Sequence, residues 1–197
     1  MNADKFTQKT IETIQTAQSM AQENGNQYLT PEHLLYALID ADGGLIGTLL
    51  GRMGVDCNAV LSELDTAIDR LPKVSGGSGE VYASPETGKI FSFAEREAKN
   101  SGDAYVSVEH LMLGIFANET ADIKRIFSAH GITKAGFAAE LKKVKTGPVT
   151  SDNPEDTYDA LKKYGTDLVE RAREGKMDPV IGRDQEIRNV IRILSRK

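Results

Sequence analysis

Two acid–histidine pairs are the residues of this sequence whose types and spacing first suggest chemistry. Glu32-His33 and Glu109-His110 each join a carboxylate to an imidazole, and histidine serves both as a metal ligand and as a general base. A zinc site would need further Cys or His residues at ligand spacing, but the remaining histidine, His130, stands apart. Each pair also falls in the first turn of an expected helix, so contacts at the helix end are the favoured interpretation. We therefore predict no metal site and no catalytic residue.

Nucleophile and nucleotide motifs are also missing from the sequence. Cys57 has no neighbour that would mark it as a nucleophile. The glycine-rich run at 75–79 lacks the lysine and hydroxyl residues of a phosphate-binding loop, and Gly88-Lys89 is followed by Ile90 instead of Ser or Thr. An ATPase in its own right is thus the least favoured function, and we expect the chain to bind no cofactor by itself.

A duplication positions both acid–histidine pairs. Residues 28–35 recur at 105–112, with an offset of 110 − 33 = 77 positions that holds without a gap over a long span. Apolar residues recur at helical spacing in both copies, and they predict four helices in each. The expected fold is all-α, a pseudo-twofold tandem repeat of two four-helix units within residues 1–146. Repeat one covers about 5–71 and repeat two about 86–146.

Helix-end signals support this interpretation. Thr30 is an expected N-cap with Pro31 at the first helical position, and Ser107 takes the same place in the second copy. Gly25 and Gly102 follow the first helix of each copy, where a left-handed residue commonly ends a helix.

Composition limits the class of protein. Twenty-four basic against 29 acidic side chains give a net charge of −5, which argues against a nucleic-acid partner. The single cysteine cannot form an intrachain disulfide, and this is typical of a reducing compartment. The sequence shows neither a signal peptide nor an apolar run long enough to cross a bilayer. We expect a soluble, cytoplasmic protein without a membrane partner.

The composition changes after Thr146. Residues 147–156 are polar and rich in proline, and they predict a flexible linker with little to bury. Residues 157–197 predict a linker helix, a break around 177–183 and a last amphipathic segment whose apolar face has nothing left to cover it. We interpret the chain as a fragment cut inside a second domain.

The two copies differ most in their first helix. Ile90 and Phe93 stand where the first copy has Thr13 and Thr16, so the second copy carries an extra apolar stripe. The stripe could pack in the seam between the repeats, or it could form an exposed patch that holds extended apolar peptide. For Phe93 the exposed patch is the favoured alternative.

Several motifs resemble one known family. Pro31-Glu32-His33-Leu34-Leu35 and its echo at 108–112 resemble the N-terminal domain of Clp-family AAA+ ATPases, while Leu71-Pro72-Lys73-Val74 and residues 160–168 resemble its ClpB-type disaggregase branch. The run at 178–184 resembles the entry to the first AAA+ domain, cut before its P-loop. The resemblance implies a parent that binds ATP and magnesium, forms a homohexamer and works with a second chaperone system.

The resemblance also implies a role and a site. The role is capture of unfolded or aggregated client proteins for the hexamer pore; the alternative is an adaptor-docking N-domain of a protease-linked, ClpA- or ClpC-like ATPase. Matching positions imply client contacts at Thr7, Asp103 and Glu109, although Glu109 also suits a first-turn helix acid and Asp103 a turn. The expected site is completed by an apolar groove along Ile90, Phe91 and Phe93. Val180 and Ile181 match the segment that lies against the adenine in the family.

Overall fold

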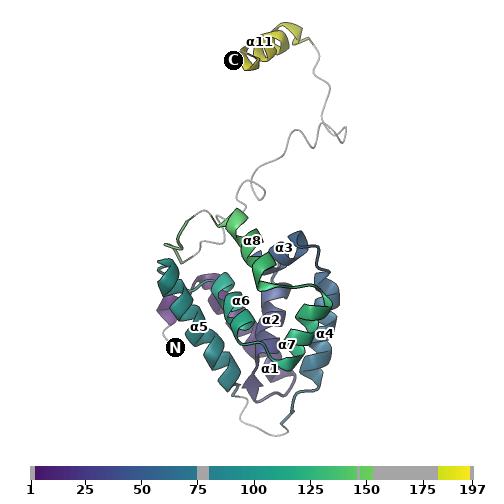
Figure 1. The fold of residues 1–197 in the computed structure, drawn as a ribbon, viewed down its shortest axis with the longest axis vertical. Coiled ribbons are helices and arrows are strands. Elements are labelled where there is room, and N and C mark those ends of the chain that lie inside the picture. The colour runs from purple at the N-terminus through teal and green to yellow at the C-terminus, as the bar shows by residue number, and fades with distance from the viewer. Residues whose placement is uncertain (1–2, 75–79, 146, 153–181, 196–197) are drawn as a thin grey trace. The chain divides into compact units, whose positions relative to one another are not determined.

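The computed structural model describes residues 3–74, 80–145, 147–152 and 182–195, which fall into two units, 1–158 and 159–197. The first unit is helical, as expected, and repeats one set of elements twice (Figure 1). A short 3-10 helix, η1 (Ala3–Lys5), precedes the first set. Repeat one comprises α1 (Gln8–Glu23), β1 (Tyr28–Leu29), α2 (Pro31–Asp40), α3 (Leu45–Arg52) and α4 (Cys57–Asp69). Repeat two comprises β2 (Tyr82–Ala83), α5 (Pro85–Ser101), α6 (Val108–Ala117), α7 (Ala121–Ala129) and α8 (Lys134–Val144).

The helix ends follow the predicted signals. Thr30 and Ser107 are the N-caps of α2 and α6. Gly25, next to the C-cap of α1, and Gly102, the C-cap of α5, both adopt φ of 73°, a left-handed conformation that glycine reaches at little cost. The tandem all-α repeat predicted from the offset of 77 is confirmed.

The two repeats exchange their leading segments. β1 pairs in parallel with β2, with Leu29 opposite Ala83, and an isolated parallel bridge joins Phe6 to Val106. The repeat offset relates these pairs, because 83 − 6 = 77 and 106 − 29 = 77. The segment that precedes the first helix of each repeat therefore pairs with the other repeat, and this exchange fixes the pseudo-twofold arrangement.

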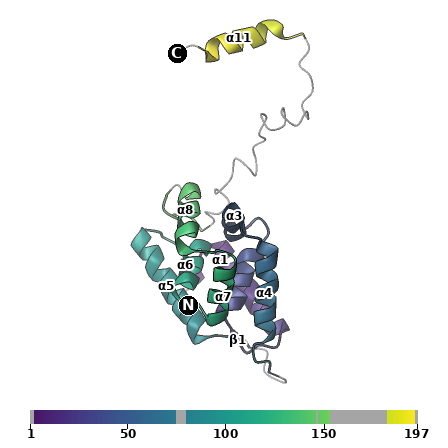
Figure 2. The ribbon, with the colours of Figure 1, turned by 45° about the vertical axis from the view of Figure 1, so that its right-hand side comes forward.

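The hydrophobic core lies around α2 and α6. These two helices contact each other, and α1, α3 and α4 pack on α2 while α5, α3 and α8 pack on α6 (Figures 1 and 2). Within the described ranges no single helix has the length and apolar character of a membrane span; α2 and α3 meet that test only as a pair, which is bent by 81°. Fully buried core side chains include Leu34, Leu35, Leu49, Leu64, Leu111, Ile115 and Phe137.

The closest approach between α5 and α6 depends on Gly114. A Cβ at this position would lie 2.9 Å from the carbonyl oxygen of Ile90 and 3.0 Å from its Cγ2. We expect Gly114→Ala to lower the free energy of unfolding by about 1–3 kcal/mol, because the two helices must separate. Gly88→Ala is the matched control, since a Cβ there meets nothing within 4 Å and is expected to stabilise α5 by about 0.5–1 kcal/mol. Urea unfolding measures both, and a Gly114→Ala variant as stable as the parent would contradict the packing.

Residues 147–152 do not behave as the sequence predicted. We call them the strap, because they lie along the second repeat after α8. Val149 is 1% exposed, and its carbonyl oxygen accepts a hydrogen bond of 2.8 Å from the amide of Ala104. The expectation of little to bury is wrong for Val149, which is buried and bonded to the domain, whereas the other five positions of the strap are exposed.

The described part of the second unit is α11 (Asp184–Leu194). It confirms the predicted amphipathic segment, and its apolar residues Ile187, Val190, Ile191 and Leu194 are exposed. The helix expected within 157–175 and the break at 177–181 lie outside the described residues.

Candidate functional site

Both histidines complete capping boxes. In repeat one the amide of Thr30 donates to Nδ1 of His33 over 3.2 Å, and Nε2 lies 3.2 Å from Oδ1 of Asn26. Because Nδ1 accepts, Nε2 carries the proton and donates. Repeat two repeats the box with Ser107 and His110, where the amide donates over 3.0 Å. The prediction that the histidines satisfy helix ends is confirmed.

Burial keeps these imidazoles neutral. It lowers the pKa of His33 from 6.5 to about 4, against the opposing charge of Glu32. Burial also lowers the pKa of His110, although Glu109 and Asp103 favour its charged form. In the ranges that the structure describes, no three His, Cys, Asp or Glu side chains are grouped to hold a metal ion. In this structure the two imidazoles act through hydrogen bonds at the starts of α2 and α6.

The three positions implied as client contacts are buried. Thr7 is the N-cap of α1, and its Oγ1 accepts a hydrogen bond of 3.3 Å from the amide of Thr10. The side chain of Asp103 is 0% exposed and that of Glu109 is 1% exposed. Two of them lie next to the strap: Thr7 precedes Gln8, whose amide donates to the carbonyl oxygen of Asp152 over 2.8 Å, and Asp103 accepts the amide of Val149.

Asp103 is the centre of a charged cluster. Its Oδ2 lies 2.7 Å from Nζ of Lys145 and 3.0 Å from Nε2 of His110, while Oδ1 accepts the amide of Val149 over 2.6 Å. Burial alone would raise the pKa of Asp103, but the hydrogen bonds from Lys145 and Val149 outweigh it and hold the pKa below its usual range. Among the described residues, Glu109 forms an ion pair with Lys145 at 3.3 Å, and neither of its carboxylate oxygens has a hydrogen-bond partner there.

The expected apolar patch on α5 is mostly filled in. Ile90 is fully buried against α6, and Phe91 is 8% exposed and part of the core, so neither lines an open groove. Ile90 lies against Gly114 of α6, in its own repeat. Phe93 is half-buried, with the guanidinium of Arg96 5.3 Å and the ammonium of Lys134 6.0 Å from its ring centre.

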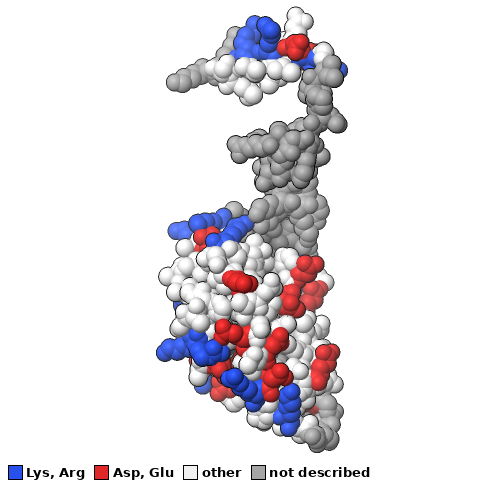
Figure 3. Space-filling view, turned by 90° about the vertical axis from the view of Figure 1, so that its right-hand side faces the viewer, with Lys and Arg blue, Asp and Glu red and all other residues white. Residues whose placement is uncertain are grey.

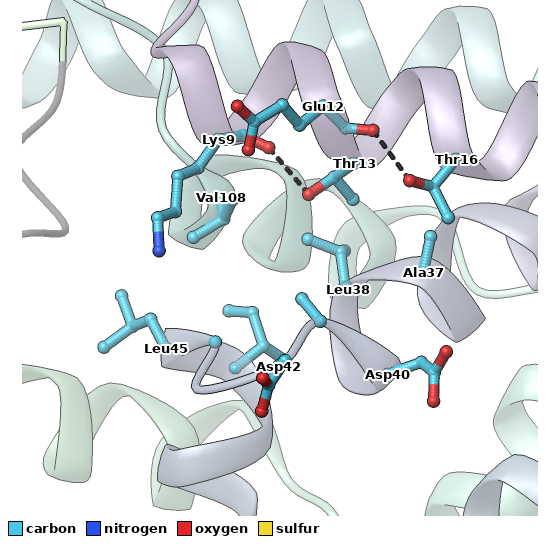
Figure 4. A pocket seen from close by; sticks show the side chains of 13 residues that line it. Lys9, Glu12, Thr13, Thr16, Ala37, Leu38, Asp40, Asp42, Leu45 and Val108 are labelled. Carbon is cyan, nitrogen blue, oxygen red and sulfur yellow. Dashed lines mark hydrogen bonds between the residues drawn. The ribbon is translucent and has the colours of Figure 1, made fainter.

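An open groove lies instead at the matching place in repeat one. We call it the α1–α3 groove; it has a volume of about 340 Å³ between α1, the α2–α3 connection and the start of α6 (Figure 4). Thr13 and Thr16 line one wall, where the second repeat has Ile90 and Phe93. Both hydroxyls donate to carbonyl oxygens of their own helix, at 2.8 and 3.0 Å. The floor of the groove is apolar and consists of Ala37, Leu38, Ala41, Leu45, Ile46 and Val108.

The rim of the α1–α3 groove is acidic. Glu12, Asp40 and Asp42 line it together with one cation, Lys9. Elsewhere charges of both signs are interspersed: the face in Figure 3 shows acidic and basic side chains among uncharged ones, without a continuous basic surface. Apolar floor and acidic rim together suit an apolar side chain of a peptide, and they favour neighbours that are not acidic.

The comparison of the repeats did contain a signal for this groove, but it lies in the small residues of repeat one and not, as we predicted, in the large residues of repeat two. Thr13 and Thr16 are smaller than Ile90 and Phe93, the residues at the matching positions of repeat two, and small side chains leave space. The other predicted site residues, Val180 and Ile181, lie outside the described residues.

Comparisons with known proteins agree with this architecture. The model of the Clp repeat (R) N-terminal domain matches residues 5–130. The chaperone protein ClpB of Brucella suis is 44% identical over 198 residues, which cover 100% of this chain and 23% of that protein. The chain thus spans about a quarter of such relatives.

Solved structures show the same fold. The Hsp104 N-terminal domain from Candida albicans matches with a TM-score of 0.67 and 21% identity, over 75% of this chain and 97% of that one. A ClpV N-domain in complex with a VipB peptide matches with a TM-score of 0.55 and 16% identity, over 71% of this chain and 88% of that one. From the family match, which covers most of its length, the chain belongs to the family of Clp repeat (R) N-terminal domains.

Proposed function

We propose that the first unit captures apolar segments of unfolded or aggregated client proteins in the α1–α3 groove, on behalf of a ClpB-type chaperone. The observation that carries the proposal is the apolar floor of the open groove in repeat one. In repeat two the buried Ile90 replaces Thr13, and the half-buried Phe93 instead lines a separate hollow of about 550 Å³ together with Pro85, Gly88 and Asn118. Similarity to relatives named chaperone protein ClpB supports the assignment, and so does a related N-domain that was solved with a peptide.

Capture in such a groove is weak and therefore reversible. A volume of about 340 Å³ accommodates one or two side chains, each worth about 1.5–3 kcal/mol when it is fully buried. Association costs take most of this gain, so one groove holds a client only briefly. Several linked copies in a hexameric parent would raise the overall affinity without new contacts.

The parent supplies the remaining steps of the proposal. ATP and magnesium bind in AAA+ domains outside this unit, the ring is a homohexamer, and a second chaperone system cooperates with it. The client passes from the groove to the pore, and the chain beyond the first unit links the two. The proposed contacts Thr7, Asp103 and Glu109 have no surface in the described conformation, so the groove replaces them as the capture site.

Filling the groove tests the proposal. Thr16→Phe introduces the side chain that repeat two carries at this position, and we expect it to weaken binding of a reduced and alkylated, permanently unfolded protein by tenfold or more. Gln22→Phe is the control, because it adds the same ring to an exposed position of α1 away from the groove. Amide chemical-shift titration of the chain measures affinity and location together.

Two outcomes would contradict client capture at this place. One is Thr16→Phe binding as tightly as Gln22→Phe. The other is a pattern of shifts that excludes α1, α2 and α3. Binding of folded proteins only, with no response to the unfolded protein, would favour the adaptor-docking alternative.

A further inference from the structure

The strap is attached to the first unit by a small set of specific contacts. Asp103 accepts the amide of Val149 over 2.6 Å, and Ala104 donates to the carbonyl oxygen of Val149 over 2.8 Å. At the far end the carbonyl oxygen of Asp152 accepts the amide of Gln8, also over 2.8 Å. Val149 itself is buried. These contacts involve both repeats, since Gln8 begins α1 and Ala104 follows α5.

Repeat one contains a neutral counterpart of this attachment. Asn26 corresponds to Asp103 and Pro72 to Val149, because 103 − 26 and 149 − 72 both equal 77. Nδ2 of Asn26 donates to the carbonyl oxygen of Pro72 over 3.1 Å. Proline has no amide hydrogen, so in repeat one the side chain must donate; in repeat two the side chain must accept the Val149 amide. Asparagine in repeat one therefore suits a partner that only accepts, the carbonyl oxygen of Pro72, and aspartate in repeat two suits a partner that donates, the amide of Val149.

The carboxylate introduces charge that repeat one lacks. Asp103 and Glu109 are both buried, and Lys145 is the cation that contacts both, at 2.7 and 3.3 Å. His110 is kept neutral by burial. Attachment of the strap therefore depends on a buried carboxylate that also binds Lys145, the C-cap of α8, two positions before the strap.

We propose that the strap is a releasable latch and that Asp103 and Glu109, with the α1 start at Thr7, position it instead of touching the client. With the strap docked, the last described attachment to the first unit is at Asp152; with the strap released, it is at Lys145. The difference is 152 − 145 = 7 residues, which adds at most about 25 Å of reach to the connection with α11. The latch sets how far the captured client can be carried, whichever ligand the groove takes.

Amide hydrogen exchange of the whole chain tests the latch. In the unaltered protein we expect Val149 and Ala104 to exchange more slowly than unprotected amides but faster than core amides of α2 such as Leu35, because the strap opens locally. In Asp103→Asn we expect Val149 and Ala104 to exchange tenfold or more faster, since the Val149 amide then bonds to a neutral oxygen in place of a carboxylate and the ion pair with Lys145 is lost. Asp122→Asn, an exposed carboxylate on α7, is the control and should leave both rates unchanged.

The same variant separates positioning from contact with a client. The latch predicts faster exchange at the strap amides of Asp103→Asn with an unchanged affinity for the unfolded protein. A client contact predicts the reverse, a loss of affinity with unchanged exchange, and that result would overturn the proposal. Unprotected Val149 in the unaltered protein, or equal acceleration at Leu35, would overturn it as well, because the strap would then be undocked or the whole unit destabilised. Failure of Thr16→Phe to affect binding would contradict the groove but would not change these exchange rates. The two proposals are therefore tested independently.

Discussion

Lowering the pH from 7 to 4 is expected to reduce the free energy of unfolding of the first unit by about 3 kcal/mol through His33 alone. The pKa of this side chain falls from 6.5 to about 4 on folding, because burial of the imidazole outweighs the opposing charge of Glu32. Between these two values the unfolded chain binds a proton that the folded chain does not. Stability is therefore fully present above pH 6.5 and is lost as the pH falls towards 4. His110 shifts in the same direction and adds to the loss.

Urea unfolding at pH 7, 6, 5 and 4 measures this dependence. His33→Gln preserves the capping box, because glutamine at N3 also reaches the N-cap amide, but it cannot titrate. We expect the variant to lose much of the slope between pH 6.5 and 4, and His33→Gln with His110→Gln to lose more. An unaltered slope in the double variant would show that other groups carry the acid sensitivity.

Replacing Lys145 with methionine is expected to destabilise the first unit by about 3–5 kcal/mol, nearer the lower value because part of the side chain is exposed. The ammonium contacts Asp103 at 2.7 Å and Glu109 at 3.3 Å, and both carboxylates are buried. Its removal leaves two buried negative charges near each other. Lys143→Met is the matched control: it belongs to the same helix, is 65% exposed and pairs only with Glu140 among the described ion pairs. We expect a change of about 0–1 kcal/mol there.

A second substitution shows whether charge is the cause. Adding Glu109→Gln to Lys145→Met removes one of the two stranded charges, and we expect the double variant to recover a measurable part of the lost stability. Thermal and urea unfolding at neutral pH give both values. If the double variant were less stable than Lys145→Met, lost packing of the lysine side chain would explain the cost better than charge.

The helical framework was predictable because its signals are local. Thr30, Ser107 and the glycines after α1 and α5 mark helix ends by their own conformational preferences, and the offset of 77 carries each mark from one copy to the other. The box made by His33 and His110 follows from their place at N3. These features need no knowledge of which helices touch.

The site depends on distant partners, and there sequence reasoning went wrong. We interpreted the larger side chain of Ile90 as part of a binding patch. The smaller Thr13, at the matching position of repeat one, instead lines the open α1–α3 groove. Whether added volume is exposed or fills space depends on the approach of α6, which Gly114 permits. Val149 likewise follows a polar, proline-containing stretch, and only the carboxylate of Asp103, 46 residues away, gives its amide a buried partner.

The exchange of leading segments says something about how such a unit arises. Phe6 pairs with Val106 and Ala83 with Leu29, so each repeat completes the other and neither closes on itself. A solitary ancestral repeat would have met the same requirement with a second copy of itself, as a segment-swapped homodimer. Joining the two copies in one chain removed the need to find a partner. Within one chain the two copies can differ: repeat one has the groove, and repeat two has the carboxylate that holds the strap.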